Sequence, residues 1–415
     1  MRKARVAGTG LYVPPTLVTN AQMAERLGKP LPESLEAKLG IKQRYVTGSD
    51  LSSADLGACA GRAAISDAGL TAEEIDLIVV ATDTPEYISP PTSSVVQGRL
   101  GAVNAGTFDV NASCTGFVTS LDMASRMIGY DRQYTNILVC GVYNMTKYID
   151  PLDEKTAPIF ADGGGAVVLQ ATEAEKTGFL SAQLYADGTQ YDYLGIYAGG
   201  TRIPVTAEAV AKKQHLLTFL KPLPADRNLK LWPVIVLQAL AKAGLTINDV
   251  DHILFTQINR WFIEEVMTIL GLPMEKTTCI MDRYGYTGSA CLPMALHHAV
   301  QEKKSRTGTQ WCLSGQELAF RQQQQSFAGK GFNTAAALTK GGELRKAAVF
   351  KEGDKVDKGN LDTLCAFVPN KRRVSPCRAK IKLKFWEGSI YEEKTSGSRY
   401  CCCLHAVFWS YRLCQ

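Results

Sequence analysis

One pattern occurs twice along the chain. An amphipathic helix that ends in Ala-Gly-Leu leads into an acidic turn and then a continuous apolar strand, first at residues 63–82 and again at 238–257. Neither strand shows the polar–apolar alternation that is typical of a sheet with one solvent-exposed face, so each strand is expected to be buried on both faces. A repeat of about 175 residues built in this way predicts two similar α/β halves, each with a central sheet flanked by helices.

The remaining periodicity up to about residue 305 fits the same architecture. We expect an N-terminal half over residues 1–172, a C-terminal half over 173–320, and a basic, poorly periodic tail over 321–415 that is atypical and poorly ordered. Strands are expected at 4–12, 75–84, 108–111, 137–142, 164–171 and 251–259, and helices at 53–70, 93–100, 115–129, 231–245, 260–271 and 290–303.

Composition excludes several classes of protein. No stretch approaches the ~20 apolar residues of a membrane span, and the N-terminus has no apolar signal core, so a cytoplasmic location is expected. The net charge of +6 is not gathered into a basic stripe before the last hundred residues, so nucleic-acid binding is not expected. The twelve cysteines form no CxxC pair, which favours free thiols and no metal site.

Cys114 has the position of a nucleophile. It lies between the apolar strand at 108–111 and the helix expected at 115–129. A thiol at a helix N-terminus gains from the free N–H groups and the helix dipole, which lower its pKa toward the reactive thiolate. The alternative interpretation is a small, inert, buried cysteine. The sequence around it decides in favour of the nucleophile.

Seven segments, in order, resemble the β-ketoacyl-[acyl-carrier-protein] synthase III family, a branch of the thiolase fold. This resemblance implies a pseudo-duplicated fold layered α-β-α-β-α and a homodimer. It also implies an acyltransferase that takes an acyl group as a thioester on Cys114 from acyl-CoA or acyl carrier protein, with no other cofactor, in fatty-acid or polyketide-type biosynthesis. The segments are 7–20, 39–56, 75–102, 107–124, 159–169, 254–260 and 282–300.

The chain departs from the family at two positions that matter for condensation. Where the family has histidine in His-Gln-Ala-Asn this chain has Thr256, and where the family has asparagine in Gly-Asn-Thr-Ser it has Tyr286. Losing one oxyanion donor typically costs ~10²–10³ in rate. His252 is on the same expected strand, but ~13 Å from Thr256. Tyr286 is expected either to fill the vacated volume or to donate a hydrogen bond.

Three functions remain open on this basis. The first is an acyltransferase or specialised condensing enzyme that loads Cys114 and passes the acyl group to an acceptor. The second is a catalytically silent partner subunit of an active paralogue. The third is a condensing synthase that uses Tyr286 as its donor.

The expected cofactor cradle also differs from the family. The adenine-stacking tryptophan and arginine of the family fall at Ser34 and Glu154, and a nearby arginine falls at Lys38. The resemblance assigns cofactor binding to Lys38 and Asn259. Losing both stacking faces favours delivery by a carrier protein, whose phosphopantetheine arm has no adenine.

The chain lacks the family's glycine-rich ending. Gln316 stands where a glycine normally supplies the second oxyanion N–H, and a run of glutamines follows at 322–325. A CAG repeat read one base out of frame would encode the serine or alanine usual there. We hypothesise that residues from about 306 come from a shifted reading frame; a genuine C-terminal extension is the alternative. An encoding DNA with no frame that restores a glycine-rich ending would refute the shift.

Overall fold

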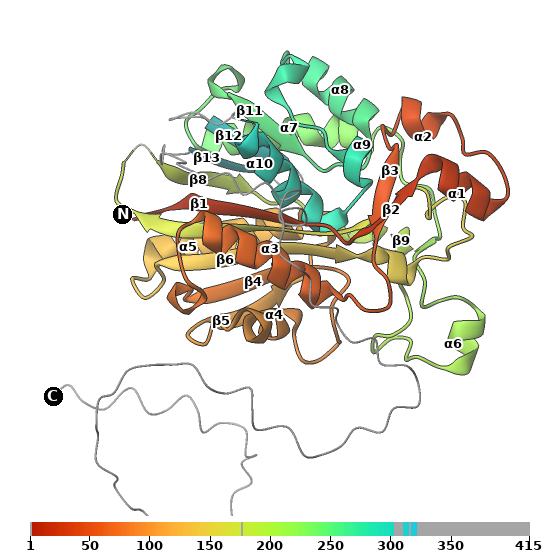
Figure 1. Ribbon diagram of the computed structural model, residues 1–415. Helices are drawn as coiled ribbons and strands as arrows, with labels where there is room; N and C mark the ends of the chain where they lie inside the picture. Colours follow the sequence, from red (N-terminus) through yellow and green to blue (C-terminus); the bar gives the residue numbers. More distant parts are fainter. Residues whose placement is uncertain (1, 176, 303–309, 315–316, 322–415) are drawn as a thin grey trace, which may run out of the picture. The chain divides into compact units, whose positions relative to one another are not determined.

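The computed structural model describes residues 2–175, 177–302, 310–314 and 317–321 (Figure 1). All of them belong to one compact unit. The atypical tail expected over 321–415 lies outside the described residues, except for residue 321. Gln316 also lies outside the described residues. In the described part of the chain, no helix is both long and apolar enough to cross a membrane.

The sequence repeat is a structural repeat. In the first copy the helix is followed by Gly69 at a left-handed φ of 71°, and Thr71 then forms a capping box with Glu74 on a short 3-10 turn. The second copy does the same with Gly244 at φ 70°, and its capping box pairs Thr246 with Asp249. The repeated elements are α3 (Ser53–Asp67), η1 (Ala72–Glu74) and β4 (Leu77–Ala81), then α7 (Arg227–Lys242), η5 (Ile247–Asp249) and β11 (His252–Phe255).

The first sheet has five strands in the order β1-β7-β6-β4-β5. Strand β4 is parallel to both β5 and β6, whereas β7 is antiparallel to β1 and β6. Every residue of β4 and β6 is buried, as the lack of alternation in the sequence predicts. The other strands are β1 (Lys3–Tyr12), β5 (Gly106–Val110), β6 (Asn136–Asn144) and β7 (Asp162–Thr172).

The second sheet has four strands in the order β11-β12-β13-β8. Strands β11 and β12 are parallel, and β13 is antiparallel to both of its neighbours, β12 and β8. Strand β13 therefore connects β8 to the rest of the sheet. The added strands are β8 (Gly178–Gln183), β12 (Gln310–Ser314) and β13 (Glu317–Arg321).

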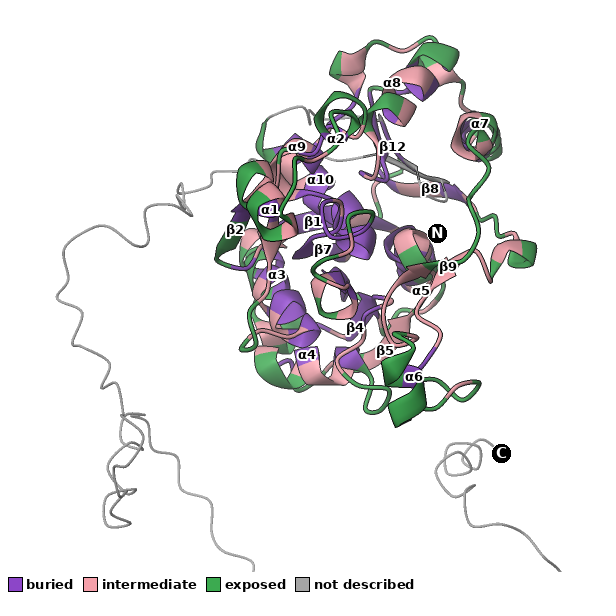
Figure 2. Ribbon diagram, turned by 90° about the vertical axis from the view of Figure 1, so that its right-hand side faces the viewer, coloured by how far each residue is buried: buried purple, intermediate pink, exposed green. Residues whose placement is uncertain are grey.

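The helices form three layers around the two sheets (Figures 1 and 2). Helices α3 and α4 cover the outer face of the first sheet, α5 and α10 lie between the sheets, and α7 and α8 pack against the second sheet. The predicted α-β-α-β-α layering of a thiolase fold is confirmed. The added helices are α4 (Thr92–Leu100), α5 (Gly116–Tyr130), α8 (Arg260–Ile269) and α10 (Cys291–Gln301).

The strand expected at 251–259 is shorter than predicted. It ends at Phe255, and just beyond it the side chain of Gln257 donates to the carbonyl oxygens of Phe255 and Thr278, at 2.8 and 3.1 Å. Asn259 then caps α8. Shorter elements complete the described fold: β2 (Thr16–Thr19), α1 (Asn20–Leu27), α2 (Ser34–Ala37), β3 (Gln43–Val46), β9 (Leu194–Gly195), α6 (Ala207–Ala211), β10 (Thr218–Phe219) and α9 (Met281–Tyr284).

Candidate active site

The candidate site forms where three parallel strands end. Because β4, β5 and β6 run in the same direction, their carboxyl ends lie at one edge of the first sheet. Asp83 follows β4, Cys114 follows β5, and Tyr143 is near the end of β6. The topology therefore places an acid, a thiol and a phenol at the same edge.

The backbone at Cys114 is held in a strained turn. Ser113 has a φ of 49°, a left-handed conformation that non-glycine residues rarely adopt. The hydroxyl of Ser289 donates to the carbonyl oxygen of Ser113 at 2.9 Å and fixes this turn from the second half of the chain. Helix α5 begins two residues after Cys114, at Gly116, whose missing side chain lets the helix approach Ala81 of β4. The thiol thus lies at a helix N-terminus, as predicted.

Tyr286 contacts the nucleophile directly. Its hydroxyl donates to Sγ of Cys114 at 2.5 Å, while the residue itself is only 1% exposed. Its ring packs against those of Phe160 and Tyr143, with centroids 5.6 and 6.1 Å away. Tyr286 therefore does both things that the sequence left open: it fills volume and it donates a hydrogen bond.

A glycine makes room for this aromatic cluster. Gly288 has a φ of 44°, and a Cβ at this position would lie 2.2 Å from the ring of Tyr143. The distance is far below van der Waals contact. Only glycine fits between Tyr286 and the turn that carries Ser289.

The expectation of a lowered thiol pKa was wrong. Burial raises the pKa of Cys114 to about 11, with a smaller contribution from the charge of Asp83. The hydrogen bond from Tyr286 and the more distant charge of Arg227 act in the opposite direction but do not outweigh burial. The helix N-terminus is present, but desolvation of the thiolate costs more than the helix supplies. At pH 7 about one thiol in ten thousand would be ionised.

Asp83 is the acidic residue at this edge that the sequence analysis missed. Its Oδ1 atom is buried and has no hydrogen-bond partner among the described residues. Burial raises the pKa of its carboxyl to about 6, partly offset by a hydrogen bond from its own backbone. The sequence analysis placed Asp83 inside the strand expected at 75–84, whereas β4 ends at Ala81 and leaves Asp83 two residues beyond it.

Thr256 is buried at the end of β11, but within the described residues no hydrogen bond joins its hydroxyl to Cys114. Its neighbour Gln257 donates a backbone hydrogen bond to the thiol of Cys291, and, after burial, the charge of Cys114 contributes to raising the pKa of that thiol. The histidines near this region have other partners. His252 contacts the hydroxyl of Thr278 at 2.9 Å, as expected for a residue that does not replace the missing histidine. His297 and His298 contact Thr9 and Tyr284.

The residues assigned to cofactor binding lie around the start of α8. Lys38 is exposed, and its carbonyl oxygen accepts from the backbone N–H of Trp261 at 3.0 Å. The side chain of Asn259 accepts from the backbone N–H of Phe262 at 3.3 Å, so its amide oxygen caps the helix. At the family's stacking positions, Ser34 begins α2 and Glu154 forms an ion pair with Lys29. Neither position presents an aromatic or guanidinium face.

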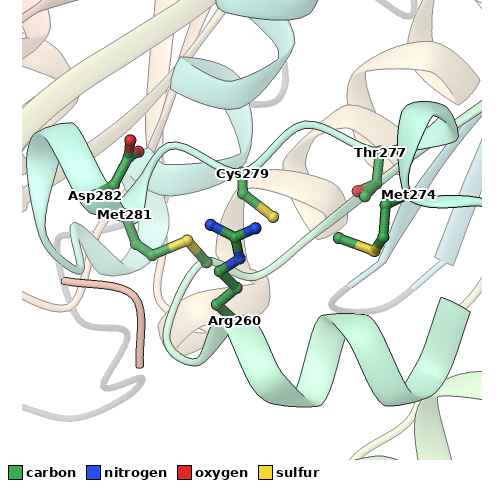
Figure 3. Close-up of a pocket in the computed structure, with 6 residues that line it drawn as sticks. All are labelled: Arg260, Met274, Thr277, Cys279, Met281 and Asp282. Carbon is green, nitrogen blue, oxygen red and sulfur yellow. The ribbon is translucent and has the colours of Figure 1, made fainter. Parts of the chain in front are cut away.

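A separate pocket of about 240 Å³ opens beside the same helix (Figure 3). It does not include Cys114, and Arg260 at its edge is already paired with Glu264. The lining of this pocket therefore does not contain the candidate nucleophile. The lining residues are Arg260, Met274, Thr277, Cys279, Met281 and Asp282.

Comparison with known proteins identifies the family of this chain. Residues 108–188 match the family model of 3-oxoacyl-[acyl-carrier-protein] synthase III, and residues 240–317 match the model of its C-terminal part. A β-ketoacyl-[acyl-carrier-protein] synthase III of Xanthomonas campestris is 36% identical over 310 residues, which are 74% of this chain and 92% of the relative. This chain belongs to the synthase III family. It is accordingly an acyltransferase of the thiolase fold.

The chain is also similar to a further relative and to solved structures. A 3-oxopimeloyl-[acyl-carrier-protein] synthase of Rhodothermus marinus is 37% identical over 71% of this chain and 85% of the relative. The crystal structure of 3-oxoacyl-(acyl carrier protein) synthase III from Pseudomonas aeruginosa aligns with a TM-score of 0.69 and 30% identity, covering 78% of this chain and 99% of the other. The priming β-ketosynthase of the R1128 polyketide pathway aligns with a TM-score of 0.68 and 26% identity, covering 78% and 97%.

Proposed function

We propose that Cys114 accepts an acyl group from acyl-CoA or acyl carrier protein and passes it to an acceptor in fatty-acid or polyketide-type biosynthesis. The observation that supports this most is the hydrogen bond from Tyr286 to Sγ of Cys114. A donor on sulfur favours the thiolate over the thiol, and the thiolate is the form that attacks a thioester. The loading step requires the donor thioester and no other cofactor.

The loading step needs less than a condensation does. The sulfur of Cys114 attacks the donor carbonyl carbon, the new C–S bond forms, and the C–S bond to pantetheine breaks as the leaving sulfur takes a proton. Condensation would also require donors for an enolate oxygen. Here the hydroxyl of Tyr286 already points to sulfur, and Thr256 has no hydrogen bond to the nucleophile. The loading step is therefore the better supported of the two.

Intact-mass measurement tests the proposal. The full chain is incubated separately with acyl-CoA and with acyl carrier protein, each with chain lengths from two to about ten carbons, alongside Cys114→Ala as the control. An acyl adduct that the Cys114→Ala variant lacks would support loading. The absence of an adduct from every donor would refute it and favour the silent partner subunit.

A second candidate is the condensing synthase in which Tyr286 donates to the enolate. It is favoured by the burial of the phenol beside Cys114. Carbon dioxide released from a malonyl carrier protein by the acylated enzyme, and lost in Tyr286→Phe, would support it. If Cys114 is acylated but no carbon dioxide is released, the condensing synthase is refuted and acyl transfer without condensation remains.

We further propose that the protein acts as a homodimer in the cytoplasm with an acyl carrier protein as its donor. The altered stacking positions at Ser34 and Glu154 favour a donor without adenine. Competition between acyl-CoA and acyl carrier protein for Cys114 would test the donor, and sedimentation would test the dimer.

A further inference from the structure

We propose that Asp83 is the general base that removes the proton of Cys114 during acyl transfer. The inference rests on the proposed function, because it explains how the thiol is activated for loading. It concerns a residue that neither the sequence analysis nor the comparisons assign to the site. The case rests on position, on unused hydrogen-bonding capacity and on charge.

The positions of Asp83 and Cys114 follow from the pairing of β4 with β5 in the first sheet. Strands β4 and β5 are parallel neighbours, and the backbone N–H of Thr82 donates to the carbonyl oxygen of Val110 at 3.1 Å. Asp83 is the next residue after Thr82, and Cys114 comes four residues after Val110. Both residues therefore leave neighbouring strands at the same edge of the sheet. Among the described residues no hydrogen bond joins Oδ1 of Asp83 to the thiol, but, in addition to burial, the negative charge of Asp83 raises the pKa of Cys114. Figure 1 shows β4 and β5 side by side beneath α5.

The hydrogen-bonding capacity of both groups is complementary. Sγ of Cys114 accepts from Tyr286, so its own S–H remains available to donate. Oδ1 of Asp83 is buried and accepts from no other group among the described residues. Buried carboxylate oxygens are normally satisfied, and an unsatisfied one beside a nucleophile is typical of a functional site. The free acceptor and the free donor lie at the same edge.

The charge balance explains why a base is needed. A thiol with a pKa of about 11 is almost entirely neutral at pH 7, whereas a carboxyl with a pKa of about 6 is mostly ionised. The acid is therefore in the form that accepts a proton, and the thiol is in the form that must lose one. The titratable and charged groups that interact electrostatically with one or both members of this pair are Tyr143, Arg227, Tyr286 and Cys291.

The step balances without another reagent. As sulfur attacks the thioester carbonyl carbon, the S–H proton moves to the carboxylate of Asp83 and a tetrahedral oxyanion forms. When the oxyanion collapses, the C–S bond to pantetheine breaks. The protonated Asp83 then returns its proton to the leaving sulfur, and the carboxylate is regenerated.

The test uses p-nitrophenyl acetate, an acyl donor that needs no carrier recognition. The burst of p-nitrophenolate is followed at its isosbestic wavelength, and the acetyl adduct on Cys114 is confirmed by mass. We expect Asp83→Asn to slow the burst ~10²–10⁴-fold at pH 7.5. The wild-type rate should rise through about pH 6 to a plateau, and this inflection should be lost in the variant. Asp122→Asn is the matched control, because Asp122 is paired with Arg126 on α5.

Other outcomes of the same experiment would overturn the assignment of Asp83 as the base. If Asp83 acted only through its charge, removing it would lower the pKa of Cys114 and speed the burst at neutral pH. An Asp83→Asn burst as fast as wild type, or faster, would overturn the proposal. If that variant does not fold, the wild-type profile decides: a rate without an inflection between pH 5 and 7.5 overturns it. A burst that depends on Asp83, in a protein that no acyl-CoA or acyl carrier protein loads, would refute the proposed function but not the base.

Discussion

Asp83→Asn should stabilise the folded protein at neutral pH although it slows the reaction. The carboxyl of Asp83 has a pKa of about 6 in the fold, against ~3.9 in an unfolded chain. The difference is about two pKa units, and each unit corresponds to ~1.4 kcal/mol. Ionised Asp83 therefore lowers the free energy of unfolding by about 3 kcal/mol, and asparagine at this position avoids the cost.

The difference in free energy of unfolding between wild type and Asp83→Asn should depend on pH. Below about pH 4 the carboxyl is protonated in both states, so its charge costs nothing. Between pH 4 and 6 the unfolded chain ionises first, and wild-type stability falls relative to the variant. Above about pH 6.5 the difference should stay constant. Urea unfolding of both proteins at half-unit steps from pH 4.5 to 8 measures it. A difference that does not change with pH would refute the burial of this charge.

Two further predictions concern the aromatic cluster. Tyr286→Phe keeps the ring but loses the donor to Cys114, so the p-nitrophenyl acetate burst at pH 7.5 should fall ~10-fold or more; an unchanged burst would show that the phenol acts only as a filler. Gly288→Ala places a Cβ against the ring of Tyr143 and strains a positive φ, so the free energy of unfolding should fall by roughly 2–4 kcal/mol. A urea midpoint equal to that of wild type would contradict the close contact.

Much of the fold could be predicted because each copy of the repeat contains residues that mark where its helix ends and its strand begins. The Ala-Gly-Leu ending, the threonine cap and the apolar strand recur at residues 63–82 and 238–257, and each local preference agrees with the layered fold. Helix α7 was less predictable, since it begins at Arg227 rather than at residue 231. Its first turn is polar and shows no helical period.

The candidate site was only partly predictable. The position of Cys114 between strand and helix is local and could be inferred, but the pKa of its thiol depends on how deeply distant segments bury it. Tyr286 is far from Cys114 in sequence, and only folding shows that its hydroxyl reaches sulfur. Asp83 falls inside the strand expected at 75–84, and only the end of β4 at Ala81 and its parallel pairing with β5 show that Asp83 and Cys114 leave the sheet at the same edge. The roles of Thr256, Lys38 and Asn259 stay predictions.

The order of the second sheet determines when the chain can finish folding. Glu317 pairs with Gln183, and among the described strands it is β13 that joins β8 to β12. During translation β8 emerges early and must wait for more than a hundred further residues before its partner leaves the ribosome. A nascent chain arrested before residue 317 would expose an unpaired strand edge, which invites association with other chains. Sequence changes near that point would therefore affect the yield of folded protein before they affect catalysis.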